Sequence, residues 1–237
     1  MERTFETQDF PVTLDLRVPF GEISIDPSNE AGVTVDLEAD DEETQALIER
    51  TRVEQHGDRI LVDVPSKNRG LGGLASFFSG RGNLICRVRC PRGSNAEVRS
   101  KSADLEAYGT LGNVDVSSAS GEVELRDVDG ALNVKTASGD VRAGRIARNA
   151  DIHTASGDID LEWVGGTVRI NAVSGDVRVG EAGGDTNVTT VSGDQEHEAV
   201  FNGGVTAQSV SGDVTVAVRR GARVYLDCNT LSGDTSS

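Results

Sequence analysis

An acidic side chain recurs at one fixed position of a repeated tripeptide. The acidic members of its eight copies are Asp104, Glu122, Asp140, Asp158, Asp176, Asp194, Asp213 and Asp234. Carboxylates stacked about 4.8 Å apart would repel one another, so a divalent cation bound between them is one interpretation. The other is that an aspartate after glycine accepts hydrogen bonds from the amides of its turn. We favour the turn role because the Gly-Gly-x-Gly-x-Asp calcium motif is absent from the sequence. We therefore expect no metal site and no cofactor.

Histidines offer little further chemistry. His56 precedes Gly-Asp in an expected turn, and His153 falls at an outward position. Gln195 and His197 are different, because they stand where the other repeats have apolar residues, and such a break marks either function or strain. Their repeat is one residue longer than its neighbours, which favours a coil defect. The sequence has no serine–histidine–aspartate order and no phosphate or dinucleotide motif, so we predict no catalytic residues and no enzyme.

Cysteines are predicted to be reduced. Cys86 and Cys90 lie in one apparent strand, where four residues span roughly 13 Å. A disulfide needs Cα atoms within about 7 Å of each other, so this pair cannot close, and Cys228 is remote in the sequence. The pair is also a weak metal motif, because no histidine pair accompanies it. These cysteines are expected to serve as small apolar residues.

The tripeptide that carries the carboxylates also sets the architecture. Ser-Gly-Asp or Ser-Gly-Glu begins at residues 120, 138, 156, 174, 192, 211 and 232, in steps of 18, 18, 18, 18, 19 and 21 residues. Counted from the serine as zero, positions 3, 5, 8, 12 and 14 are mostly aliphatic and the positions between them are polar. This alternation predicts two strands per repeat, each with one buried face, joined by corners at the tripeptide and near position 10. We predict an all-β, parallel β-solenoid of about 18-residue coils.

The first part of the chain, residues 1–99, is interpreted as degenerate coils that form a cap continuous with the regular repeats of 100–237. Phe20–Ile25 resembles the start of a coil, with Gly32–Leu37 as its second strand. A short helix is expected near Asp41–Arg50, because acidic residues open this segment and arginine closes it. Further strands are predicted at Arg52–Gln55, Arg59–Val64 and Leu84–Cys90.

Basic residues gather between residues 66 and 103, where eight of them face one acidic residue, a balance of +7. The glycine-rich part, 66–83, is predicted to be a loop with an apolar tip at Phe77 and Phe78. An apolar tip with basic flanks is typical of weak binding to anionic membranes. A solvated strand face with an inert loop is the alternative. The candidate interaction residues are Phe77, Phe78, Arg69, Arg81, Arg87 and Arg89.

The composition limits partners and location. The 237-residue chain has a formal net charge of −16, which would repel phosphate backbones and argues against nucleic acid as a partner. No export signal or apolar membrane span is visible, so a cytoplasmic protein, perhaps at a membrane surface, is expected. The last complete coil, with Val214, Val216, Val224 and Leu226, has no evident cover, which predicts a protein partner or self-association at the C-terminal coil edge.

The repeated Thr/Val-x-Ser-Gly-Asp-Val pattern, as in residues 136–141, resembles the bacterial "putative adhesin" β-strand-repeat family of unknown function, whose relatives include the toastrack domains of envelope-stress proteins. The resemblance covers most of residues 10–237. It implies a right-handed β-solenoid, no established catalytic residues and a role near the cell envelope. We predict a non-enzymatic structural or interaction protein that presents a repetitive acidic surface. The alternative is a peripheral membrane or envelope-stress scaffold that docks through residues 66–83.

Overall fold

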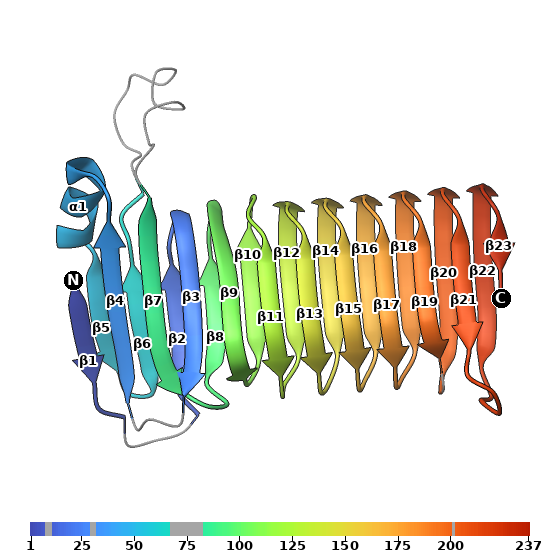
Figure 1. The fold of residues 1–237 in the computed structure, drawn as a ribbon, viewed down its shortest axis with the longest axis horizontal. Helices are drawn as coiled ribbons and strands as arrows, with labels where there is room; N and C mark the ends of the chain where they lie inside the picture. Colours follow the sequence, from blue (N-terminus) through green and yellow to red (C-terminus); the bar gives the residue numbers. More distant parts are fainter. Residues whose placement is uncertain (8–10, 29–31, 67–82, 201) are drawn as a thin grey trace.

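The protein is a two-sided β-solenoid in which 23 strands and one helix form a rod, seen here in a computed structural model (Figure 1). The structure describes residues 1–7, 11–28, 32–66, 83–200 and 202–237. The strands form two sheets of 12 and 11 strands, called here the first and the second sheet. The all-β solenoid class is thus confirmed, as are coils about 18 residues apart.

Each regular coil contributes one strand to each sheet, as the alternating pattern predicted. The first sheet contains β9 (Ser102–Leu111), β11 (Val123–Val128), β13 (Val141–Ile146), β15 (Ile159–Val164), β17 (Val177–Ala182), β19 (Gln195–Val200), β21 (Val214–Val218) and β23 (Thr235–Ser236). The second sheet contains β8 (Asn95–Arg99), β10 (Val114–Ser118), β12 (Leu132–Ser138), β14 (Ala150–Ser156), β16 (Val168–Ser174), β18 (Thr186–Ser192), β20 (Gly204–Ser211) and β22 (Tyr225–Ser232). Neighbouring coils pair in parallel and in register, so that Val123 faces Val141 and Val134 faces Ile152.

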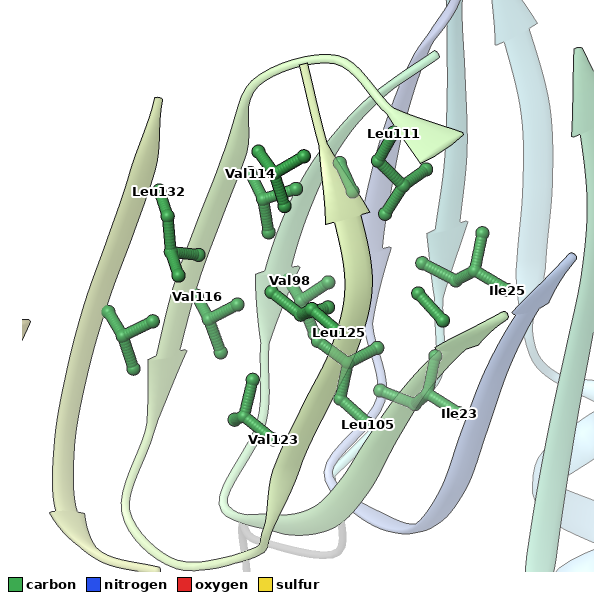
Figure 2. Packing of buried hydrophobic residues seen from close by; sticks show 14 of the residues in the cluster. Ile23, Ile25, Val98, Leu105, Leu111, Val114, Val116, Val123, Leu125 and Leu132 are labelled. Carbon is green, nitrogen blue, oxygen red and sulfur yellow. The ribbon is translucent and has the colours of Figure 1, made fainter. Parts of the chain in front are cut away.

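The core is a set of aliphatic columns between the two sheets (Figure 2). Val123 and Leu125 of β11 point inward toward Val116 of β10, and all three side chains are buried. Successive side chains of a strand point to opposite faces, so one residue type repeated every 18 positions forms a continuous buried column. Each coil therefore covers the apolar face of the next.

The Ser-Gly-Asp corner depends on glycine. Gly157 has a φ of +124°, and a Cβ atom there would lie 2.3 Å from the carbonyl oxygen of Gly139 in the preceding coil. Only glycine tolerates both the backbone angle and the close approach. The amide of Gly157 in turn donates to the carbonyl of Ser174, which links this corner to the following coil.

The N-terminal region is a cap that ends the rod. β1 (Glu2–Phe5) and β4 (Val33–Ala39) run antiparallel at the edge of the first sheet, and β5 (Arg52–His56) does so at the edge of the second. The predicted helix is confirmed as α1 (Glu42–Glu49), which is N-capped by the Asp41 side chain. One prediction was wrong: the 33–37 segment is not the second strand of a coil. It lies in the first sheet as part of β4, because it turns back to pair with β7 (Leu84–Pro91).

The first coil of the chain is enclosed between later ones. β2 (Thr13–Arg17) lies between β6 (Arg59–Asp63) and β8, while β3 (Phe20–Ser28) lies between β7 and β9. The chain thus leaves this coil, builds the cap, returns on one side as β6–β7 and crosses to the other side as β8–β9.

A buried carboxylate ties this enclosed coil to its neighbours. The Asp15 side chain on β2 is 4% exposed and accepts hydrogen bonds from Arg17, from Arg59 of β6 and from Arg99 of β8. Burial alone would raise the pKa of Asp15, but the surrounding guanidinium groups outweigh it and lower the pKa below its usual value. Asp15 therefore stays ionised and holds three strands of the second sheet together.

The C-terminal coil is better covered than expected. Val214 and Val216 are each 1% exposed, because β23 pairs with β21 and the last residues complete part of a further coil. The prediction that they lie uncovered was wrong. Val224 and Leu226 are partly buried, and the exposed Tyr225 and Leu231 flank them on β22.

Core substitutions test the register of the columns. Val141→Asp and Ile152→Asp should each lower the free energy of unfolding by at least about 3 kcal/mol, because each places an unpaired charge among aliphatic side chains. Arg142→Gln is the matched control, since Arg142 neighbours Val141 but forms only exposed ion pairs, with Asp140 and Glu122, and should cost little. Urea unfolding followed by circular dichroism measures all three. Equal losses in the three variants would contradict the register.

Candidate functional site

The repeated carboxylates serve the backbone. Oδ1 of Asp158 accepts a hydrogen bond from the amide of Asp176 at 2.9 Å, and the same bond joins Asp176 to Asp194. The predicted turn role is confirmed in kind and corrected in detail, because the amide belongs to the following coil rather than to the same turn. Asn149 makes the equivalent bond at the opposite corner, to the amide of Thr167. Within the described residues, no group of three or more histidine, cysteine or acidic side chains could hold a metal ion.

The cysteines are free thiols placed as predicted. Cys86 and Cys90 are buried in β7, and burial raises the pKa of each thiol to about 12. Both are therefore protonated at neutral pH and poor nucleophiles, since reactivity requires the thiolate. Cys228 on β22 is half-buried, and burial raises the pKa of its thiol as well.

Gln195 and His197 form a polar layer inside the solenoid. Both side chains are 1% exposed, and both residues keep their register with β17 and β21. The pairing with β21 shifts only after His197, so the anomaly at these two positions is one of polarity, not of backbone geometry. Gln195 donates to Thr190 and to the carbonyl of Gln208, but neither ring nitrogen of His197 has a partner in the described structure. This layer separates the main hydrophobic core from a smaller one beyond it.

Of the six candidate interaction residues, Phe77, Phe78, Arg69 and Arg81 lie outside the described residues. Arg87 and Arg89 are on the outward face of β7. Their charges are matched by acidic residues of the cap, because Arg87 contacts Glu38 at 2.7 Å and Arg89 lies 3.9 Å from Glu2. They are therefore not an isolated basic patch.

Arg87 and Arg89 instead line a hollow on the outer face of the first sheet, with a volume of about 420 Å³. A larger hollow of about 650 Å³ lies on the same face, over β9, β11, β13 and β15, and is called the contact groove below. Tyr108 of β9 lines both hollows and is 57% exposed. The two hollows therefore meet at Tyr108.

A bulge, a glycine and a tryptophan shape the contact groove. In β9, Tyr108 and Gly109 together face the single residue Arg126 of β11, because the pairing shifts between Leu125 and Asp127. Such a bulge redirects a side chain, and here Tyr108 forms one end of the groove. Gly144 of β13 leaves the floor without a side chain.

Trp163 of β15 forms the other end of the groove. The guanidinium of Arg145 lies over its ring, 4.7 Å from the centroid. Sequence reasoning missed this groove. The available signal was that Tyr108 and Trp163 occupy outward positions of the repeat, where the other coils carry polar or small residues.

The second sheet also has a hollow on its outer face, of about 660 Å³. Small polar residues such as Ser117, Thr136 and Thr189 make up much of its lining, which includes no aromatic ring. Binding sites usually combine apolar or aromatic surface with a few placed polar groups, so the contact groove is the stronger candidate.

Comparison with known proteins gives a family and a fold. A family model described as Toastrack DUF4097 matches residues 13–236. A crystal structure described as a putative adhesin from Bacteroides fragilis is similar with a TM-score of 0.54 at 13% identity, covering 100% of this chain and 96% of that one. A second, from Parabacteroides merdae, has a TM-score of 0.51 at 11% identity and covers 100% and 95%. No curated protein sequence matches this chain. Among the described residues, no helix is long and apolar enough to cross a membrane.

The buried histidine should make stability depend on pH. Burial lowers the pKa of His197 from 6.5 to about 4, so the folded state holds the neutral ring while the unfolded chain takes up a proton near pH 6.5. Stability is then complete above pH 6.5 and falls as the pH drops toward 4, by about 3 kcal/mol at most. His197→Leu should remove this part of the acid sensitivity. Urea unfolding of both proteins from pH 7.5 to 4 measures the difference, and His153→Leu, at an exposed site, is the control. Parallel pH profiles for wild type and His197→Leu would disprove the assignment.

Proposed function

The chain belongs to the Toastrack DUF4097 family, and we propose that it is a non-enzymatic interaction protein whose contact surface is the outer face of the first sheet between β7 and β15. The observation that carries the proposal is the pair of hollows that meet at Tyr108. Their lining is fixed by in-register strands, so the surface is rigid before a partner arrives. Preorganisation of this kind reduces the cost of binding.

The charge of the chain supports a presenting role. A net charge of −16 disfavours nucleic acid and leaves proteins or carbohydrates as the better partners. The Ser-Gly-Asp carboxylates are the most regular acidic feature, but their Oδ1 atoms are engaged by backbone amides, as in Asp140 and Asp158. The outer strand faces are therefore better placed than this corner for contact. The solved relatives described as adhesins make an adhesin-like role a reasonable form of the proposal.

Site-specific photocrosslinking tests the contact face. A benzophenone amino acid at position 126, on the groove side of β11, should yield adducts in the native host. The same probe at position 133, on the outer face of the second sheet, should yield few, because both positions are exposed but only 126 lines a groove. Adducts at 133 that equal or exceed those at 126 would refute the proposed face. A third probe at position 225 reports on self-association at the β22 edge, which would give an adduct of twice the chain mass.

Docking on an anionic membrane through residues 66–83 is the alternative proposal, and the basic composition of this segment is what supports it. Wild-type protein should then float with anionic vesicles at low salt. Binding should fall with added salt and with the double substitution Phe77→Ser/Phe78→Ser, because both charge and apolar insertion contribute. Vesicle flotation measures this. A wild-type protein that stays at the bottom of the gradient at low salt would exclude the alternative.

A further inference from the structure

The contact groove has aromatic rings at both ends and runs across successive coils. Tyr108 and Trp163 belong to coils three steps apart, about 14 Å along the rod at the usual strand spacing. The floor between them includes Ala107, Ala143 and Gly144, which project little or nothing from the sheet. A ligand that fits must be extended, and it must offer apolar faces to rings at two separated points.

The polar lining alternates in sign along the groove. In the column of position 4, Glu106, Glu124, Arg142 and Asp160 follow one another from strand to strand. In the neighbouring column Asp127 lies beside Arg145. Carboxylates only accept hydrogen bonds and guanidinium groups only donate them. A surface that alternates the two can satisfy hydroxyl groups, each of which both donates and accepts.

Several of these polar groups have no partner among the described residues. Glu124, Arg126 and Glu162 are exposed and form no hydrogen bond or ion pair through their side chains within the described chain. They can bind a ligand without first breaking an internal contact. Arg142, by contrast, already bonds to Asp140, which fixes the nearby edge of the groove.

The mixture of charges argues for an uncharged ligand. A polycation would meet Arg126, Arg142 and Arg145, and a polyanion would meet the groove's five carboxylates. Like charges brought together in this way reduce affinity for either partner. A neutral sugar chain avoids both penalties, since its rings carry C–H faces for aromatic contact and hydroxyl groups for the alternating polar columns.

We propose that the contact groove binds a neutral oligosaccharide laid along the rod between Tyr108 and Trp163. This inference rests on the proposed function and names the ligand class of the same face. Arg145 packs on the Trp163 ring and holds that side chain in place. The bulge at Tyr108 and Gly109 sets the opposite end, so the distance between the rings is built into the backbone.

The chain carries its own reporter for the test, because Trp163 is its only tryptophan. Purified full-length protein is titrated with cellotetraose, xylotetraose, mannotetraose and chitotetraose while Trp163 fluorescence is followed, and calorimetry confirms any hit. At least one sugar should bind with a dissociation constant below about 10 mM, and binding should change little between low and high salt. Tyr108→Ala should weaken it by about tenfold or more, as loss of one aromatic contact implies. Tyr225→Ala, at an exposed tyrosine on β22 remote from the groove, should leave it unchanged.

Three results would overturn the proposal: no sugar of the panel binds below that limit, the Tyr108 and Tyr225 variants lose affinity equally, or tetralysine binds in a salt-dependent way while the sugars do not. Unfolding curves of both variants show that each is folded. Failure here leaves the proposed function intact if crosslinking at position 126 still yields adducts. Absence of those adducts would instead remove the face itself.

Discussion

The close approach of successive coils at the Ser-Gly-Asp corner is the constraint on which the fold depends. A Cβ atom at Gly139 or Gly157 would lie 2.2–2.3 Å from a carbonyl oxygen of the coil before it, and both residues have φ values that side chains rarely adopt. Because the corner admits one arrangement, each coil stacks directly above the last. The aspartate that follows each glycine then accepts the amide of the next coil, as Asp158 does from Asp176. Register at the corner fixes the buried columns, and the columns fix which residues reach the outer faces.

Periodicity explains how much of this could be predicted. The columns that include Val123, Val141 and Ile159 were readable because one environment recurs every 18 residues. The cap was harder, since antiparallel pairing leaves no repeat in the sequence. The 33–37 segment alternates as a coil strand does, yet it pairs with β7 in the first sheet. Nothing local distinguishes the two outcomes, because both bury the same face.

The candidate site was predicted less well, for a related reason. The carboxylates were prominent because they repeat, and repetition here reflects backbone demands. The contact groove arises where the repeat is broken, by the extra residue beside Tyr108, the missing side chain at Gly144 and the ring of Trp163. These three breaks are far apart in the sequence and become neighbours only through the stacking. Gln195 and His197 show the limit of the rule, since they also break the pattern yet lie inside the core.

The enclosed first coil has a consequence for how the chain is made. β2 and β3 leave the ribosome first, but β6 and β7 cover one side of them and β8 and β9 the other, so their neighbours do not exist until about residue 111 has been synthesised. The apolar strands of the nascent chain must wait, exposed, through this interval. The first hundred or so residues therefore fold as one unit. Beyond β9, each coil can dock on a finished template as it emerges, so synthesis and assembly proceed in the same direction.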